Sequence, residues 1–366
     1  MSKKSAPENV GLKVREVRKR LRAAKADAML VKNEVDYFYL TGFTGADSAA
    51  IITPRDIHVL TDGRFLEEIK HEIPWTRVWL RKGLLNDEVA KVCTEVKLKR
   101  LAVQPEHLTL SDQKDLKKKV KGIRLIPAPP ILAQMRRLKN DDELAAMSRA
   151  IRVAEDAFKA TLLTIRPGQT ELEMAARLEY EMKRRGASGP AFNTICAEGP
   201  NAAKPHAVPG NRKTRKGSAI LFDWGARVGG YNSDLTRMVF VGSIPPKIGE
   251  IYRIALEAQQ AAIAAIRPGR KMCDVDGVAR KIITDAGYGK QFTHGLGHGL
   301  GLEVHEAPSL SWRSKEELVP GMVVTVEPGI YLPGIGGVRI EDDVLVTSRG
   351  HRVLTHLNKS LESAVI

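Results

Sequence analysis

The chain has 366 residues, of which 43% are hydrophobic and 28% charged, so it can bury a sizeable core and is not disordered, collagenous or fibrous. Its length fits two domains of ordinary size. No apolar run approaches the roughly 20 residues of a membrane helix, and no apolar core follows the basic first residues as in a secretory signal. Cys93, Cys196 and Cys273 are scattered without CxxC spacing, which argues against a disulfide framework and favours a reducing cytoplasm.

The formal net charge of +15 is unevenly spread. Residues 1–135 carry 26 basic and 17 acidic side chains, so this third of the chain holds +9 of the excess. A basic surface can attract nucleic acid or an anionic membrane. However, only 5% of the residues are aromatic, and none interleaves with the basic runs as a base-stacking platform would. We therefore interpret the charge as a solvated surface and expect neither nucleic acid nor a membrane as a partner.

Residues 1–135 predict an α/β domain. Apolar positions at helical spacing predict an opening helix over 10–26. Short apolar runs then alternate with helical patterns, which predicts a sheet covered by helices. The predicted strands are 28–31, 48–53, 58–61, 77–80 and 100–103. The proline-bearing PAPP at 127–130 marks the boundary, so 136–366 forms a second domain.

The second domain opens with a long amphipathic helix, capped by Asn140 or Asp141. It also contains a faint internal repeat. The tetrapeptide IRPG at 165–168 recurs 101 residues later, and the run from Gly217 to Asp223 has a counterpart 104 residues on, from Gly321 to Glu327. We therefore expect two α/β halves related by a pseudo-twofold axis, with paired acids at their centre.

Four carboxylates lie in or beside apolar, strand-like runs, where acids are unfavourable. They are Asp223, Asp234, Glu327 and Glu341. A buried salt bridge explains one such acid, but several in one domain indicate a divalent cation as the common partner. Gly229 and Gly230 allow a tight hairpin that brings the first two acids together, and a turn-rich connection does the same for the second two. Four carboxylates on two hairpins suit a pair of bridged metal ions.

Histidines and one arginine accompany these acids. His294, His298 and His305 lie in a glycine-rich run whose glycines argue against a helix. The run also fails the dinucleotide-binding pattern GxGxxG, because Leu302 takes the place of the last glycine. Arg339 lies two residues before an acid and so on the same face of a strand. A further candidate is His206, in a Pro/Gly-rich loop.

These residues lie in four ordered segments, LFDWGARVGGYNSDLTR, FTHGLGHGLGLEVHEAP, VVTVEPGIY and GVRIEDD. Together they resemble the pita-bread metallopeptidases, specifically the Xaa-Pro branch that contains aminopeptidase P and prolidase. YLTGFTG at 39–45 and LTDGRF at 60–65 extend the similarity into the first domain. The resemblance implies an N-terminal creatinase-like α/β domain followed by a catalytic pita-bread domain.

The resemblance also implies which residues bind metal and which act on the substrate. Two divalent cations are expected, bridged by Asp234 and Glu341. The expected metal ligands are Asp223, Asp234, His298, Glu327 and Glu341. The expected substrate-facing residues are His206, His294, His305 and Arg339. In relatives the N-terminal domain completes the active site of a neighbouring subunit, so a homodimer is expected.

The expected reaction is hydrolysis of the bond that precedes a proline in the second position of a peptide. A hydroxide held between two cations is a nucleophile near neutral pH, and Glu327 is placed to carry its proton to the leaving nitrogen. The Xaa-Pro bond lacks an N–H, which handicaps ordinary proteases. Four carboxylates and one imidazole favour Mn²⁺, while Co²⁺ and Zn²⁺ also fit.

Two alternatives remain at this point. Prolidase requires a free proline carboxylate, whereas aminopeptidase P acts on longer peptides. In the loop 306–316, Arg313 and Lys315 are candidate partners for such a carboxylate, although exposed loop charges explain them equally well. We favour aminopeptidase P. The other alternative is a catalytically silent binding module, against which the complete set of five ligands argues.

Overall fold

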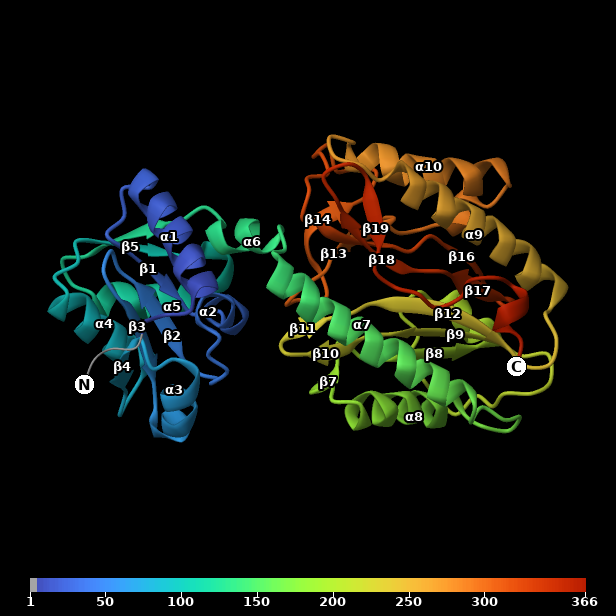
Figure 1. Cartoon of the computed structure of the whole chain (residues 1–366), viewed down its shortest axis with the longest axis horizontal. Helices are drawn as coiled ribbons and strands as arrows, with labels where there is room; N and C mark the ends of the chain where they lie inside the picture. Colours follow the sequence, from blue (N-terminus) through green and yellow to red (C-terminus); the bar gives the residue numbers. More distant parts are fainter. Residues whose placement is uncertain (1–4) are drawn as a thin grey trace. The chain divides into compact units, whose positions relative to one another are not determined.

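The structure is a computed structural model that describes residues 5–366. They form two compact units, the first ending at Arg136 and the second beginning at Arg137, each with its own hydrophobic core (Figure 1). Every helix in the described part of the chain is too short or too polar to span a bilayer.

The N-terminal unit is a six-stranded sheet of order β4-β3-β2-β1-β5-β6 surrounded by helices. Strand β2 runs antiparallel to both of its neighbours, and the other pairs are parallel. The strands are β1 (Ala28–Val31), β2 (Ala49–Ile52), β3 (Ile57–Thr61), β4 (Arg77–Leu80), β5 (Arg100–Val103) and β6 (Arg124–Pro127). The helices are α1 (Glu8–Ala23), α2 (Glu34–Thr41), α3 (Leu66–Glu72), α4 (Leu85–Glu95), α5 (Leu110–Lys119) and α6 (Ile131–Arg136), with two 3₁₀ turns, η1 (Gly63–Phe65) and η2 (Pro105–His107).

The five strands predicted for this unit are confirmed to within one residue at each end. The opening helix is also confirmed, and its buried face is Val10, Val14, Val17 and Leu21. Strand β6 was missed because it is a partly exposed edge strand that ends in a proline, so it lacks the apolar run of the others.

The C-terminal unit contains four long helices and several small sheets. Its helices are α7 (Asp141–Leu162), α8 (Glu171–Arg184), α9 (Pro246–Ala265) and α10 (Met272–Asp285), with 3₁₀ turns η3 (Gly199–Ala203), η4 (Gly289–Gln291) and η5 (Glu362–Ala364). Its first strands are β7 (Gly189–Pro190), β8 (Ile195–Glu198), β9 (Ala219–Trp224), β10 (Ala226–Val228), β11 (Tyr231–Asn232) and β12 (Leu235–Phe240). The later strands are β13 (Gly297–Gly299), β14 (Glu306–Leu310), β15 (Val323–Val326), β16 (Gly329–Leu332), β17 (Gly336–Arg339), β18 (Asp342–Val346) and β19 (His351–Val353).

The internal repeat predicted from the sequence is visible in this unit. The sheet β8-β9-β12 has the same strand order as β13-β15-β18, and a helix pair precedes each set, α7 with α8 and α9 with α10. Both IRPG turns are closed in the same way, because the N–H of Gly168 donates to the Thr214 carbonyl at 2.8 Å and that of Gly269 donates to Leu318 at 2.9 Å. Figure 1 shows the strands of the unit lying between these two helix pairs.

The start of α7 illustrates how local sequence defines an element. The Asn140 side chain accepts from the N–H of Glu143 at 2.9 Å, and the Glu143 carboxylate accepts from the N–H of Asn140 at 3.0 Å. This reciprocal capping box satisfies two N–H groups that the first turn leaves free. The helix therefore begins where the sequence predicted it, and its apolar face packs on the first half of the unit.

Candidate metal centre and active site

The first two carboxylates meet through the predicted hairpin. Strands β9 and β12 pair antiparallel, and Asp223 near the end of β9 lies opposite Thr236 in β12. Asp234 immediately precedes β12. The chain reverses between the two strands at Gly229 and Gly230, whose φ angles of 58° and 82° suit glycine. Both carboxylates therefore lie at the same end of one strand pair.

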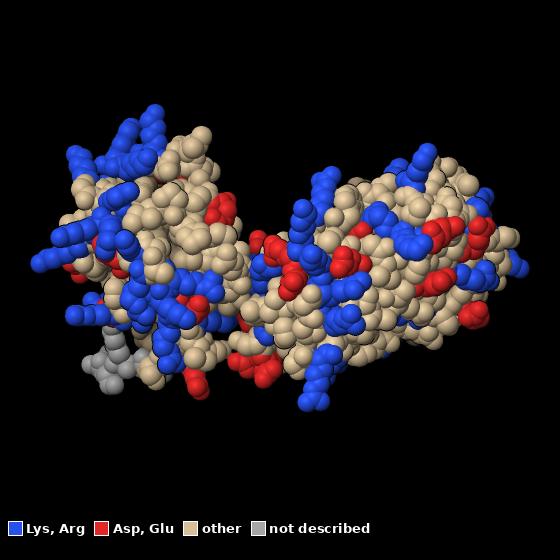
Figure 2. Space-filling view, turned by 90° about the horizontal axis from the view of Figure 1, so that it is seen from above, with Lys and Arg blue, Asp and Glu red and all other residues tan. Residues whose placement is uncertain are grey.

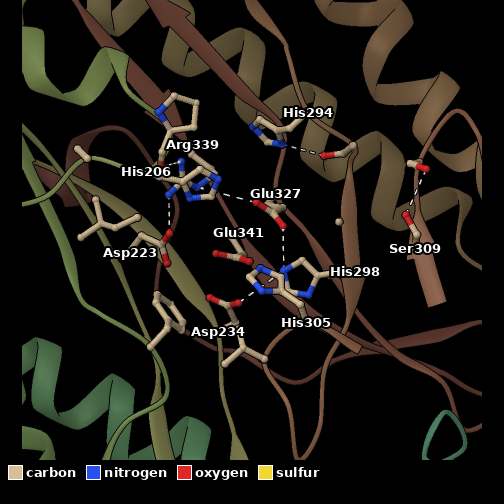
Figure 3. Close-up of a pocket in the computed structure, with 18 of the residues that line it drawn as sticks. His206, Asp223, Asp234, His294, His298, His305, Ser309, Glu327, Arg339 and Glu341 are labelled. Carbon is tan, nitrogen blue, oxygen red and sulfur yellow. Dashed lines mark hydrogen bonds and ion pairs between the residues drawn. The ribbon is translucent and has the colours of Figure 1, made fainter. Parts of the chain in front are cut away.

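The second half repeats this arrangement with glutamates. Glu327 follows β15 and Glu341 precedes β18, two strands that pair antiparallel with Val326 opposite Asp342. The two halves bring their acids together, and the close-up shows all four carboxylates around one point (Figure 3).

His298 in β13 completes the cluster. Its Nε2 atom lies 3.3 Å from Glu327 Oε1 and 3.7 Å from Asp234 Oδ2. Its Nδ1 atom lies 3.1 Å from the Gly299 carbonyl oxygen, which can only accept, so Nδ1 carries a proton and Nε2 is the ring nitrogen that could bind a cation after losing its own proton. Ligand atoms of Asp234, His298 and Glu341 all lie within 4.8 Å of one another.

The electrostatics of the cluster match a site built for cations. Burial and then the neighbouring carboxylates raise the pKa values of Asp234 and Glu341 well above their ordinary range. Burial also raises the pKa of Glu327, but the hydrogen bond and charge of His298 outweigh it and bring it to about 2. The cationic side chains Arg339 and His298 therefore do not suffice to keep all four carboxylates ionised, and a bound cation would do so.

One orphaned atom supports the same conclusion. Asp223 Oδ2 accepts from Arg339 Nη2 at 2.5 Å, but Asp223 Oδ1 is buried and has no hydrogen-bond partner among the described residues. A buried carboxylate oxygen without a partner is costly. A divalent cation would satisfy it, and the oxygen-rich donor set with one imidazole fits such an ion.

Arg339 contacts the carboxylate cluster directly, and its position in the strand predicted that it would face the cluster. Besides Asp223, it lies 4.0 Å from Glu327 Oε2, and its Nε donates to Thr236 Oγ1 at 3.1 Å. Thr236 in turn donates to Glu341 Oε2 at 2.7 Å. Thr236 was not singled out from the sequence, although its position two residues after Asp234 places it on the same strand face.

The remaining histidines differ in what they can do. His294 Nδ1 donates to the Gly295 carbonyl, so its Nε2 accepts from Tyr331 OH at 2.9 Å, and both ring nitrogens are engaged. Burial lowers its pKa, which is consistent with this neutral form. His206 and His305 also line the cavity, and no ring nitrogen of either forms a hydrogen bond within residues 5–366. Tyr331 was missed, although it lies in the quoted segment VVTVEPGIY.

The centre lies in a cavity of about 1010 Å³. Its lining also includes Phe192, Val208, Trp312 and Arg313, and Val208 is 81% exposed. Lys315, the other predicted loop cation, is not among the lining residues. The cavity therefore combines the acid cluster with apolar side chains and the exposed Arg313.

Two family models match this chain. Creatinase/Prolidase N-terminal domain matches residues 13–138, and Metallopeptidase family M24 matches residues 145–348. The chain belongs to metallopeptidase family M24. The enzyme is therefore a pita-bread metallopeptidase of the Xaa-Pro type, and its substrates are peptides.

Relatives with known structures cover nearly the whole enzyme. It is similar to the Xaa-Pro dipeptidase of Bacillus anthracis, with 38% identity over 98% of this chain and 100% of that one and a TM-score of 0.93. The X-Pro aminopeptidase of Thermotoga maritima shares 36% identity over 95% of this chain and 100% of that one, with a TM-score of 0.89. The sequence of the Xaa-Pro dipeptidase of Pyrococcus horikoshii is 36% identical over 92% of this chain and 94% of that protein. The predicted family and fold class are confirmed.

Proposed function

We propose that the enzyme is a dinuclear Xaa-Pro dipeptidase, which cleaves dipeptides whose second residue is a proline with a free carboxylate. The observation that carries this choice is Arg313, which lines the same cavity as the acid cluster and pairs with no carboxylate in the described part of the chain. A guanidinium can bind a carboxylate through two parallel hydrogen bonds, in a bidentate arrangement. Two of the relatives above carry the name dipeptidase, which supports the same choice.

This proposal reverses the preference for aminopeptidase P drawn from the sequence. The sequence offered Arg313 and Lys315 equally, and nothing in it said whether either faces the site. A longer peptide continues past the proline and presents no carboxylate at that point, so a cation there favours dipeptides. The catalytically silent module is set aside, since the family match covers the catalytic domain.

The residues that would hold the cations are those predicted. We assign Asp223 to one position, His298 and Glu327 to the other, and Asp234 and Glu341 to both. Two divalent cations, when bound there, lower the pKa of water and polarise the carbonyl of the bond to be cut. Mn²⁺ is our proposal for the physiological ion, with Co²⁺ and Zn²⁺ as the alternatives that this donor set accepts.

The protein groups then divide the remaining work. Arg339 fixes the Asp223 and Glu327 carboxylates in place through its contacts to both. Glu327 is assigned to carry a proton from water to the leaving proline nitrogen. His206 and His305, whose ring nitrogens are not otherwise engaged among the described residues, are assigned to donate to the carbonyl oxygen of the substrate.

The test uses metal-stripped enzyme reloaded with Mn²⁺, with the bound metal counted by mass spectrometry. Turnover of Ala-Pro and of Ala-Pro-Ala is then measured in parallel. We expect about two ions per chain and turnover of Ala-Pro in large excess over Ala-Pro-Ala. A preference for Ala-Pro-Ala would contradict the dipeptidase proposal, and metal-independent turnover would contradict the metal assignment.

A matched pair of variants isolates the carboxylate partner. Arg313→Gln should raise the KM for Ala-Pro by about 10- to 100-fold, because a charge-assisted hydrogen bond contributes about 1.5–3 kcal/mol. Lys315→Gln, two residues away and outside the cavity lining, should leave KM unchanged. Equal effects of the two substitutions would mean that loop charge in general, and not one contact, governs binding.

The homodimer and the cytoplasmic location stay predictions. Light scattering after size-exclusion chromatography tests the first. A monomer with full activity would contradict the expected contribution of a neighbouring subunit.

A further inference from the structure

Exposed cations gather at one end of the sheet in the N-terminal unit. Strands β1, β3, β4, β5 and β6 all run in the same direction, so the segments that lead into them lie side by side at one sheet edge. The turns from α1 to β1, from α4 to β5 and from α5 to β6 all lie there, as does the turn from β2 to β3. We call the exposed cations of these segments the cationic edge: Lys25, Arg55, Lys97, Lys99, Lys121 and Arg124.

Backbone contacts confirm that these segments adjoin. The N–H of Asp27 donates to the Arg100 carbonyl at 3.0 Å, which joins the β1 and β5 turns. The N–H of Arg124 donates to the Lys99 carbonyl at 2.8 Å, which joins the β5 and β6 turns. The cationic edge is therefore continuous across these three neighbouring strands.

Little negative charge offsets these side chains. Two acids at this end, Asp27 and Asp56, are already paired with Arg100 and Arg77. Glu95, in the last turn of α4, is a further exposed acid nearby. Within residues 5–366, no side chain of the cationic edge forms an ion pair. Its charges are therefore available to a partner.

Helix dipoles explain only part of this gathering. The C-terminal ends of α1, α4 and α5 point to this edge, and a cation there is favourable. That accounts for Lys25, Lys97 and Lys121, which follow the three helices. It does not account for Arg55 in a strand–strand turn or for Arg124, which begins a strand. The cations that helix dipoles do not explain indicate a surface that faces an extended anionic partner.

We propose that the cationic edge binds the phosphodiester backbone of nucleic acid without regard to sequence. The five neighbouring strand ends from β3 to β6 span about 19 Å at about 4.8 Å per strand, which matches between five and six base pairs at about 3.4 Å each. Lys and Arg on a rigid frame suit such repeated phosphates. This role is independent of the peptidase site.

An anionic membrane fits the edge less well. Peripheral binding gains from apolar side chains that enter the lipid boundary. The large exposed apolar residues Leu84 and Leu110 stand at the starts of α4 and α5, at the opposite end of the sheet. Figure 2 shows Lys and Arg crowding the visible face of the N-terminal unit with little red between them. The edge itself offers charge and not an apolar anchor.

The sequence hid this surface because its members are spread over about a hundred positions. Only the parallel topology collects them. The absence of interleaved aromatics still excludes base stacking, so the proposal is limited to backbone contacts.

The test measures binding of the full-length enzyme to a fluorescent 20-base-pair DNA duplex and to an RNA duplex of equal length, from 50 to 200 mM salt. We expect a Kd of about 1–100 µM and a slope of log K against log salt of about −4 to −5, as for four to six phosphate contacts. The triple variant Lys97→Glu, Lys99→Glu, Lys121→Glu should weaken binding at least about 100-fold and reduce the slope by about three.

The matched control is Lys213→Glu, Lys216→Glu, Lys290→Glu, which changes the net charge equally at exposed lysines of the other unit. It should keep most of the affinity, and both triple variants should keep the parent's peptidase activity, which shows that they fold. Equal loss in the control would mean diffuse attraction by net charge and would overturn the proposal. No binding by the parent enzyme, or binding to phosphatidylserine vesicles but not to duplexes, would also overturn it.

Discussion

Glu171 is the residue whose replacement best tests how the cavity-lining loop that carries His206 is held. It is 1% exposed and begins α8. Its carboxylate accepts from the N–H of Glu198 at 2.7 Å, from the Asn201 amide at 3.0 Å on each oxygen, and from the N–H of Gly210 at 2.9 Å. These contacts fasten both ends of the loop that carries His206.

The expected cost of Glu171→Gln follows from these four hydrogen bonds. Glutamine keeps one carbonyl oxygen, which serves one pair of donors, and presents an NH₂ group to the other pair. Two hydrogen bonds to a buried charged acceptor are lost, at about 1.5–3 kcal/mol each. The variant should be less stable by about 3–6 kcal/mol, and its kcat should fall about tenfold as His206 loses its fixed position.

Urea unfolding followed by tryptophan fluorescence measures this cost. With a slope of about 3 kcal/mol per molar urea, the midpoint should fall by about 1–2 M. The control is Glu173→Gln in the same helix turn, an exposed capping-box residue where glutamine is also accepted, and it should cost about 0.5 kcal/mol or less. A midpoint for Glu171→Gln within about 0.3 M of this control would refute the reasoning.

Three further predictions concern other parts of the enzyme. Arg280→Lys should lower kcat/KM about tenfold and also lower stability, because the guanidinium donates to the His294 carbonyl at 2.8 Å and to both oxygens of the buried Asp276 carboxylate; unchanged kinetics would show that the contact to His294 is dispensable. The native enzyme should react with Ellman's reagent only at Cys273, because burial raises the pKa of the other two thiols, and three fast-reacting thiols would contradict their burial. Burial raises the pKa of Asp27, but hydrogen bonds from the Arg100 side chain and from two backbone N–H groups outweigh it, so the folded-state pKa lies below the unfolded value. The stability that the ionised Asp27 contributes is therefore complete above about pH 4 and is lost as the pH falls through its folded-state pKa. Asp27→Asn should be less stable than the parent by about 1 kcal/mol at pH 6 and equal to it at pH 2. A difference in stability that persists at pH 2 would refute this.

The part of the site that sequence could predict is the part that depends on local chain geometry. Acids at the ends of apolar runs, separated by glycines that must turn, define two hairpins without any knowledge of the tertiary fold. For that reason Asp223 and Asp234 were placed together correctly. The IRPG repeat predicted the two halves for the same reason, since a helix stop and a turn are local events.

The parts that the sequence could not supply depend on which groups share a hydrogen-bond network. His294 lines the cavity, and its role toward the substrate stays a prediction, but the sequence did not show that Gly295 and Tyr331 engage both of its ring nitrogens. Arg313 and Lys315 are both cations of the same loop, and only the path of the loop shows that Arg313 alone of the two lines the cavity. Such differences arise from contacts between segments that are 20 to 40 residues apart, which no periodicity records.

The repeat of strand order has a mechanical consequence. Each half supplies two of the four carboxylates, so neither half alone contains the complete set of proposed ligands. The boundary between the halves therefore runs through the candidate metal centre, so divalent ions bound there would hold the two halves together. Because separating the halves would release the ions, the free energy of ion binding would add to the stability of the C-terminal unit. A chelator should then lower the melting temperature of this unit in step with ion loss, and the stability of the enzyme should depend on the concentration of available metal.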